Sequence, residues 1–299
     1  MSASFAKAVE AAHDAAGSQN NPASTLYVVA TPIGNLADIS LRALHVLAKV
    51  DAVACEDTRH TQQLLRAYGL DRPGGQLLAV HQHNEAEAAQ TVIARLAQGE
   101  RVAYVSDAGT PAISDPGARL VAAVRQAGYR VLPLPGASSV TTALSASGMT
   151  GDQGFVFTGF LPSKSAERQQ AVQVLAQESR AVVLLEAPHR IEALAQALSV
   201  LGERPITVGR ELTKQFEQIE TLPAQDLPAW LAEKPDRQRG EFVLVLHDAP
   251  VAKSTGEGLR VLKVLLPELP LKTAVKLAAE ITGESKNVLY DKALALKNG

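Results

Sequence analysis

Residues 102–117 read VAYVSDAGTPAISDPG, a short apolar run that leads into a loop of small residues. The run Val102–Val105 is apolar throughout, which is typical of a parallel strand covered on both faces. A helical pattern follows at residues 117–127. The same order appears earlier in the chain, where Leu26–Ala30 leads into the loop TPIGN and then into a helical pattern at 38–49. A strand, a loop of small residues and a helix in succession favour βαβ units around a parallel sheet.

The same alternation continues through the first half of the chain. Further short apolar runs predict strands at Ala52–Cys55, Leu77–Val80 and Val131–Leu134. Helical patterns separate most of these runs, at residues 59–68, 85–98 and 138–147. At the start of the helix predicted over 38–49, either Asp38 or Ser40 is a suitable N-cap. We therefore expect an N-terminal α/β domain over residues 25–150.

A second domain is expected after the Gly-rich stretch SGMTGDQG at residues 147–154. Apolar runs there predict strands at Phe155–Thr158, Ala181–Leu185, Ile206–Val208, Phe216–Thr221 and Phe242–Leu246. Residues 215–220 alternate polar and apolar side chains, which indicates a half-exposed antiparallel strand. Helices fit residues 164–177 and 190–201. These elements predict a second α/β domain over residues 151–250, with a mixed sheet.

The two ends of the chain differ from its middle. Residues 1–24 are rich in Ala, and polar side chains interrupt every apolar stretch. A secretory signal needs about 7–15 uninterrupted apolar residues, so we expect a mobile tail instead. Residues 253–299 carry eight Lys and Arg against five Asp and Glu, and helices fit 257–266, 271–281 and 286–296. A short Gly-containing turn joins the last two helices, which fits either a basic helix-turn-helix unit or a small bundle docked on the second domain.

Composition excludes several classes of protein. The chain of 299 residues is 46% hydrophobic and 20% charged with a net charge of −2, which is ordinary for a folded globular protein. No apolar run reaches the roughly 18–20 residues of a membrane span. Because Cys55 is the one cysteine, neither an intramolecular disulfide nor a multi-cysteine zinc site is available. We expect a cytoplasmic protein without a metal centre.

Three strand ends run into loops that suit ligand binding. These loops are residues 30–35, 106–111 and 135–139, all rich in small residues. In open α/β sheets ligands bind beyond the carboxyl ends of the strands, where small residues let the backbone approach closely. Asp107 directly follows a strand, where its carboxylate can accept hydrogen bonds from a ligand. Asp115 before Pro116, in contrast, is typical of a helix N-cap. Neither a P-loop nor a GxGxxG fingerprint is present.

Polar side chains also gather at other ends of elements. The stretch CEDTRH at residues 55–60 follows the second strand. It fits either a functional cluster or a solvated turn in which Asp57 or Thr58 caps the next helix. Lys164, the stretch EAPHR at 186–190 and the stretch RELTK at 210–214 belong to the second domain. All three are placed where a cleft facing the first domain would form.

Seven motifs in order carry a resemblance to a known family. They are VATPIGNLADIS (29–40), CEDTRHT (55–61), YVSDAGTPAISDPG (104–117), LPLPGASSVTTALSASG (132–148), FTGFLPSK (157–164), EAPHRI (186–191) and GRELTK (209–214). Together they closely resemble the tetrapyrrole methylase family, and within it the bacterial enzymes that methylate the 2′-hydroxyl of a cytidine in 16S ribosomal RNA. The likeness covers roughly residues 25–250, and ITGESKNVLYDKAL resembles the C-terminal extension of those enzymes.

This resemblance implies a two-domain α/β fold and a homodimer, with S-adenosylmethionine bound in the cleft between the domains and no metal. The motif TPIGN then places Pro32, Ile33 and Gly34 on the cofactor side. The motif SDAGTP supplies Asp107, Ala108, Gly109 and Thr110, where the tetrapyrrole enzymes have Gly-Asp-Pro. The RNA enzymes share that departure. The motif PGASS supplies Ala137 and Ser138.

The same resemblance implies a ribose 2′-hydroxyl as the acceptor and 16S ribosomal RNA or the small ribosomal subunit as the partner. The 2′-hydroxyl is a poor nucleophile until a base takes or polarises its proton. The candidates for this base are Glu56, Asp57 and Glu186, in no fixed order. Candidates for contacts with RNA phosphates are Arg59, Lys164, Arg190, Arg210 and Lys214. Two other functions stay open. A methyltransferase acting on a carbon of a tetrapyrrole would not need the basic extension, and a non-catalytic RNA-binding factor would not need the acidic residues at the cleft.

Overall fold

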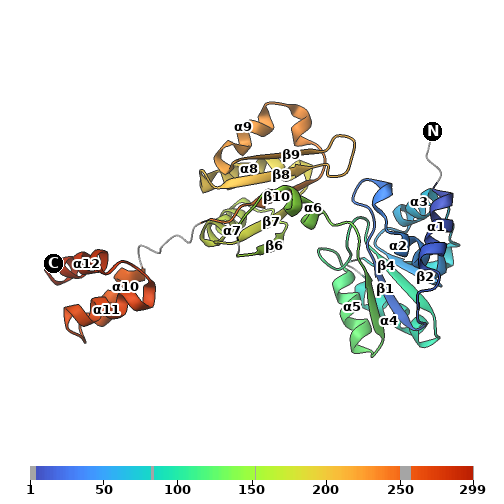
Figure 1. Ribbon diagram of the computed structural model, residues 1–299, viewed down its shortest axis with the longest axis horizontal. Coiled ribbons are helices and arrows are strands. Elements are labelled where there is room, and N and C mark those ends of the chain that lie inside the picture. Colours follow the sequence, from blue (N-terminus) through green and yellow to red (C-terminus); the bar gives the residue numbers. More distant parts are fainter. Residues whose placement is uncertain (1–4, 82–83, 152, 250–256, 299) are drawn as a thin grey trace.

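The computed structural model describes residues 5–81, 84–151, 153–249 and 257–298. Within these residues, two five-stranded sheets follow one another along the chain, and a group of helices forms the C-terminal part (Figure 1). The predicted α/β class, with a parallel sheet, a mixed sheet and a helical C-terminal region, is confirmed. In the described part of the chain, no helix is both long and apolar enough to cross a bilayer.

The first sheet is parallel throughout and has the order β3-β2-β4-β1-β5. Its strands are β1 (Thr25–Val29), β2 (Ala52–Cys55), β3 (Leu77–Ala79), β4 (Arg101–Val105) and β5 (Arg130–Leu134). Helices α2 (Leu41–Lys49) and α3 (Thr58–Ala67) pack on one face, and α4 (Glu85–Ala97) and α5 (Gly117–Gln126) pack on the other. Ser40 provides the N-cap of α2, because its hydroxyl accepts the N–H of Ala43 at 3.1 Å.

The connections from β1 and β4 leave the sheet on opposite faces, since α2 and α5 cover different sides. These two strands are neighbours, so a crevice opens between their carboxyl ends. Thr31 and Gly109 bridge the two loops there: each N–H donates to the other's carbonyl, at 3.0 and 3.1 Å. Gly109 has φ +80°, which glycine adopts without strain. The fold therefore forms its natural ligand site at the loops 30–35 and 106–111.

The second sheet is mixed and has the order β6-β7-β10-β8-β9, in which β6 and β7 are parallel and the other pairs antiparallel. Its strands are β6 (Phe155–Gly159), β7 (Ala181–Glu186), β8 (Pro205–Arg210), β9 (Gln218–Pro223) and β10 (Phe242–Leu246). Helices α7 (Ser165–Gln177), α8 (Ile191–Leu198) and α9 (Leu227–Ala232) pack on one face. On the other face lies α6 (Ser139–Ala146), which follows β5 and lies beside β10 (Figure 1). Helix α6 therefore links the third small-residue loop to the second sheet.

Short 3-10 helices complete the two domains. They are η1 (Leu36–Asp38), η2 (Gly74–Gln76), η3 (Pro188–Arg190), η4 (Ser199–Leu201), η5 (Ala224–Asp226) and η6 (Pro235–Gln238).

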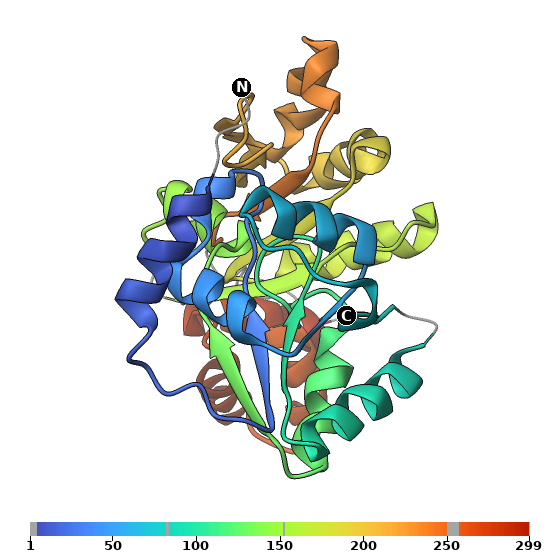
Figure 2. The ribbon, with the colours of Figure 1, turned by 90° about the vertical axis from the view of Figure 1, so that its right-hand side faces the viewer.

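The N-terminal segment forms a docked helix, α1 (Ala6–Ala16), so the expected mobile tail is wrong for these residues. The helix packs along α2 on the flank of the first domain, where it is the dark blue helix of Figure 2. Ala12 and Ala16 are buried, and the ring of Phe5 contacts Tyr68 edge-on at 5.5 Å between centroids. The Ala residues at 8, 12 and 16 recur every four positions, so they lie on one helix face and let α2 approach closely. Residues 1–4 lie outside the described part.

The C-terminal region consists of α10 (Glu257–Leu265), α11 (Leu271–Thr282) and α12 (Lys286–Asn298) around a small apolar core. Gly283 ends α11 with φ +68°, as a glycine C-cap commonly does. Beside it, the buried carboxylate of Glu284 accepts the N–H of Gly258 at 2.7 Å and the ammonium of Lys292 at 2.9 Å. One side chain thus ties the start of α10 to α12 across the turn.

We predict that Ala12→Asp lowers the free energy of unfolding by about 1–3 kcal/mol, because a charge would replace a methyl group in the α1–α2 contact. Ala11→Asp is the matched control, since Ala11 is exposed on the same helix. Denaturant unfolding of both variants checks this. Equal stability of the two would contradict the docking of α1.

Candidate functional site

Two adjoining cavities lie between the first and second sheets. The apolar cavity, of about 310 Å³, has walls from Ile33, Ala108, Leu185, Pro188 and Leu212. The polar cavity, of about 470 Å³, is lined by Glu56, the loop 106–110, residues 113–115, residues 138–140, Phe157 and Phe160. Ala108, Ser139, Phe160, Leu185 and Glu241 line both cavities. A single cleft thus has an apolar end and a polar end.

Most of the residues predicted to bind the cofactor lie at these cavities. Ile33 and Ala108 line the apolar cavity, and the polar cavity is lined by Asp107, Ala108, Gly109, Thr110 and Ser138. Ala137 supports the wall, because its carbonyl accepts the hydroxyl of Thr110 at 3.0 Å. Pro32 is buried beside Ile33. Gly34 has a different position, at a contact between the two domains.

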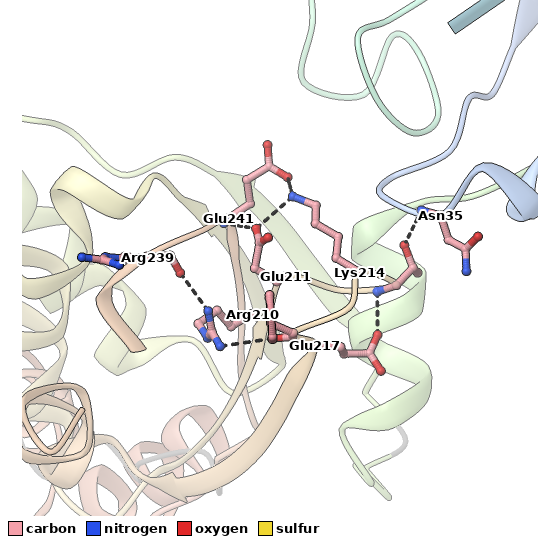
Figure 3. Close-up of polar contacts among 9 residues, drawn as sticks. Asn35, Arg210, Glu211, Lys214, Glu217, Arg239 and Glu241 are labelled. Carbon is pink, nitrogen blue, oxygen red and sulfur yellow. Dashed lines mark hydrogen bonds and ion pairs between the residues drawn. The ribbon is translucent and has the colours of Figure 1, made fainter. Parts of the chain in front are cut away.

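Gly34 lies against the second domain without room for a side chain. A Cβ atom there would lie 2.4 Å from Cγ of Lys214 and 3.1 Å from the carbonyl oxygen of Leu212. Next to it, the N–H of Asn35 donates to the hydroxyl of Thr213 at 3.1 Å (Figure 3). The first small-residue loop therefore rests directly on residues 212–214, and this contact sets the width of the cleft.

The segment that receives this contact is held by a charged cluster (Figure 3). The ammonium of Lys214 donates to Glu211 at 2.8 Å and to Glu241 at 3.0 Å. Burial alone would lower the pKa of Lys214, but these two hydrogen bonds raise it above its usual value. Glu211 and Thr213 have φ of 51° and 65°, a strained region for residues with side chains. Lys214 is thus committed to two carboxylates, and the predicted phosphate contact would require it to leave them.

Glu56 and Asp107 join the ends of β2 and β4 at the polar cavity. The N–H of Asp107 donates to Glu56 Oε1 at 3.2 Å, and the N–H of Asp57 donates to Asp107 Oδ1 at 3.3 Å. Burial raises the pKa of Glu56, the hydrogen bond from Asp107 opposes this, and the charges of Asp107 and Asp115 raise it further. A carboxylate with a raised pKa beside a cavity is suited to accept a proton.

Asp57 is the N-cap of α3. Its carboxylate accepts the N–H of Arg59 at 2.8 Å and that of His60 at 3.4 Å. The side chain of Arg59 also donates to it at 3.1 Å. Together these interactions lower the pKa of Asp57 to about 2. So weak a base is poorly suited to proton transfer at neutral pH, and the solvated-turn alternative describes Asp57 better.

Glu186 presents a buried carboxylate at the apolar cavity. Its Oε1 lies 3.0 Å from Nε of Arg190 and accepts the N–H of Ala187 at 3.0 Å. Its Oε2 is buried and has no hydrogen-bond partner among the described residues. A buried acceptor without a donor is costly, so this oxygen suits a ligand that brings an N–H or O–H. Glu186 therefore fits cofactor binding better than proton transfer.

Apart from Lys214, the four other predicted phosphate-binding side chains divide into two groups. Arg59 and Lys164 have side chains 87% and 78% exposed, so both can reach a nucleic acid. Arg190 donates to the carbonyl of Leu161, and Arg210 donates to the carbonyls of Arg239 and Phe216, both at 3.2 Å. These two guanidinium groups hold the second domain together, and the predicted phosphate contacts would require them to leave these carbonyls.

Several cavity residues were not singled out from the sequence. Phe157 and Phe160 lie in the motif FTGFLPSK, from which only Lys164 was given a role, and Glu241 lies in none of the seven motifs. Asp115 does more than cap a helix: it accepts Gly117 N–H at 2.8 Å, Ala112 N–H at 2.7 Å and the hydroxyl of Tyr104 at 2.9 Å. These contacts fix the wall that carries Ile113. Among the described residues, no group of three His, Cys, Asp or Glu side chains could hold a metal ion.

Comparison with known families gives two matches that together span most of the chain. Residues 25–228 match the family described as Tetrapyrrole (Corrin/Porphyrin) Methylases. Residues 252–297 match the RsmI C-terminal HTH domain.

Similar proteins are named Ribosomal RNA small subunit methyltransferase I. The one from Pseudomonas aeruginosa is 50% identical over 278 residues, which cover 91% of this chain and 97% of that protein. The one from Escherichia coli O157:H7 is 47% identical, over 93% of this chain and 97% of that protein. The likeness therefore extends over nearly the full length of both relatives.

Solved structures of two other proteins share the fold. Cobalt precorrin-4 methyltransferase has a TM-score of 0.55 at 19% identity, over 74% of this chain and 94% of that one. Diphthine synthase also has a TM-score of 0.55, at 15% identity, over 75% of this chain and 90% of that one. At these identities the likeness concerns the fold alone.

We predict that Gly34→Ala lowers the free energy of unfolding by about 1–3 kcal/mol, because the new methyl group would overlap Lys214 and the backbone of Leu212. It should also weaken ligand binding in the cleft. Gly74→Ala is the control, since a Cβ there meets nothing within 4 Å. If the two variants unfold at the same denaturant concentration, the contact between the domains is looser than described.

Proposed function

The chain belongs to the tetrapyrrole methylase family, and from this premise we propose that it methylates the ribose 2′-hydroxyl of a cytidine in 16S ribosomal RNA. The relatives named Ribosomal RNA small subunit methyltransferase I, alike over nearly their whole length, support this substrate. The structural observation that carries the proposal is Glu56, a carboxylate with a raised pKa at the polar end of a two-part cleft.

The apolar cavity is suited to S-adenosylmethionine. Ile33, Leu185 and Leu212 offer apolar walls for an adenine ring, and the unpartnered Oε2 of Glu186 offers an acceptor for an amine or ribose hydroxyl. The small-residue loops at 106–110 and 137–139 let the protein backbone come close to the remaining polar groups of S-adenosylmethionine. When bound there, S-adenosylmethionine supplies an electrophilic methyl group on a sulfonium.

The polar cavity is suited to the acceptor ribose. Glu56 would take or polarise the proton of the 2′-hydroxyl, and its raised pKa makes it a stronger base than an exposed glutamate. Asp107 orients Glu56, because its backbone N–H donates to that carboxylate. Most of the rate enhancement would come from holding hydroxyl and donor in line, which can contribute about 7–11 kcal/mol.

Exposed basic groups are available for the RNA backbone. Arg59 lies just beyond Glu56 in the chain, and Lys164 precedes α7 on the second domain. The C-terminal helices carry an excess of three positive charges over residues 253–299. Such contacts fix the register of the RNA without reading its sequence. We infer that Arg59, Lys164 and the C-terminal helices contact 16S ribosomal RNA, either free or in the small subunit.

The alternatives have less support. A tetrapyrrole methyltransferase shares the fold, but the match of residues 252–297 to the HTH domain favours the RNA branch. A non-catalytic RNA-binding factor would need no proton acceptor in the cleft, whereas Glu56 has the raised pKa that suits one. As the family resemblance implies, we further propose a homodimer that works in the cytoplasm.

Glu56→Gln should lower kcat about 10²- to 10⁴-fold, because the amide cannot accept the hydroxyl proton. In the unsubstituted protein, kcat should rise with pH through the pKa of Glu56, above the usual range of a glutamate, because the base acts only when deprotonated. The variant should lose this rise of kcat with pH, and it should bind S-adenosylmethionine with unchanged affinity. Glu87→Gln, at an exposed position of α4, is the control. Normal turnover of Glu56→Gln on small ribosomal subunits would remove Glu56 from the mechanism.

The family resemblance assigns the side chain of Asp107 to the methyl donor, beside its backbone contact with Glu56. Asp107→Ala should therefore weaken the binding of S-adenosylmethionine by roughly 10- to 100-fold, the usual range for a hydrogen bond to a charged group. Isothermal titration calorimetry measures this directly. Asp71→Ala is the control, because that carboxylate is exposed and pairs with Arg66 on the surface. Intact affinity in Asp107→Ala would refute the assigned role.

A further inference from the structure

We propose that Phe160 and Ile113 hold the base of the acceptor nucleotide between them, out of its stack, at the opening of the polar cavity. The inference rests on the proposed function and names the part of the site that receives the base rather than the ribose. Neither residue is assigned to proton transfer. Ile113 lines the polar cavity alone, whereas Phe160 also borders the apolar cavity assigned to the methyl donor.

Both side chains are large, apolar and unusually exposed. The exposed fractions are 51% for Phe160 and 55% for Ile113, although both line the same polar cavity. They come from different domains, since Ile113 lies in the loop after β4 and Phe160 directly follows β6. Apolar side chains at the opening of a cavity are typical of binding surfaces for a flat, partly apolar ligand.

The backbone holds each side chain in this exposed position. On the first domain, Asp115 accepts the N–H of Ala112, whose φ of +67° turns the chain just before Ile113. The hydroxyl of Tyr104 holds Asp115 in place at 2.9 Å. The turn is therefore anchored on a buried strand, and Ile113 cannot easily fold inward.

On the second domain, an irregularity of the strand directs Phe160. The pairing of β6 with β7 shifts register between Phe157 and Gly159, and Gly159 has φ +66°. Such bulges re-aim side chains and are frequent beside active sites. The next residue, Leu161, is buried, and its carbonyl accepts the guanidinium of Arg190. Phe160 is thus fixed on both sides by structure that does not depend on its own packing.

The chemistry of the substrate gives such a surface a use. A nucleotide that enters the cleft to bring its 2′-hydroxyl to Glu56 brings its base with it, away from its neighbours in the RNA. RNA-binding proteins commonly receive an unstacked base on an aromatic face. Ser114 and Glu241 line the same cavity and can meet the polar edge of a pyrimidine. An aromatic ring on one side and a branched aliphatic chain on the other fit such a flat ring.

The test compares Phe160→Ala and Ile113→Ala with Phe160→Tyr, which keeps an aromatic face. We expect kcat/KM for small ribosomal subunits to fall roughly 10- to 100-fold in Phe160→Ala and less in Ile113→Ala, with most activity kept in Phe160→Tyr. Affinity for S-adenosylmethionine should stay near that of the unsubstituted protein in Ile113→Ala. In Phe160→Ala, whose ring also borders the apolar cavity, any loss of that affinity should be smaller than the fall in kcat/KM. The melting temperatures should stay near that of the unsubstituted protein. Phe216→Ala is the matched control, since Phe216 is 69% exposed but lines neither cavity.

A second readout separates a base contact from a general effect on the site. Small subunits reconstituted with an abasic acceptor nucleotide should lose reactivity with the unsubstituted protein, and Phe160→Ala should cause no further loss on them. Additive losses would overturn the proposal, as would unchanged kcat/KM in Phe160→Ala or a fall explained wholly by weaker S-adenosylmethionine binding. If the unsubstituted protein itself methylates no subunit, the proposed function fails and the inference fails with it.

Discussion

Two backbone hydrogen bonds between Thr31 and Gly109 set the geometry on which the rest of the cleft depends. They hold together the loops that follow neighbouring strands β1 and β4, whose helices leave on opposite faces of the sheet. The first loop then rests on residues 212–214 through Gly34, and the second carries Asp107. Because these loops are tied to each other and to the second domain, the cleft has a fixed width and distinct apolar and polar ends.

Within this frame, neighbouring carboxylates acquire different properties from their surroundings. Glu56 is partly buried near other acidic groups, so its pKa rises. Asp57, one residue later, caps α3 and pairs with Arg59, so its pKa falls to about 2. Groups whose pKa values are pushed apart in this way commonly take different roles in catalysis. The structure thus separates a candidate base from a structural anchor, which the sequence CEDTRH could not do.

Sequence patterns predicted the two sheets and the loops at the cleft, because apolar runs and small-residue loops are local signals. These patterns failed where the position of a segment or side chain depends on a contact with residues far away in the sequence. The Ala-rich start of the chain was interpreted as a tail, since its partner α2 lies more than twenty residues away. Arg210 was expected on the RNA surface, but carbonyls of Arg239 and Phe216 hold it inside. The short helix α9 was not anticipated. Phe160 lies in the motif FTGFLPSK but was given no role, because the bulge that directs its side chain cannot be recognised in the sequence.

The most direct test is methyl transfer from labelled S-adenosylmethionine to small ribosomal subunits from a strain that lacks this protein, followed by mass spectrometry of the nucleosides. The account predicts 2′-O-methylcytidine as the product, which identifies the reaction, the acceptor atom and the substrate class together. A methyl group on a base, or no transfer while S-adenosylmethionine still binds, would contradict it.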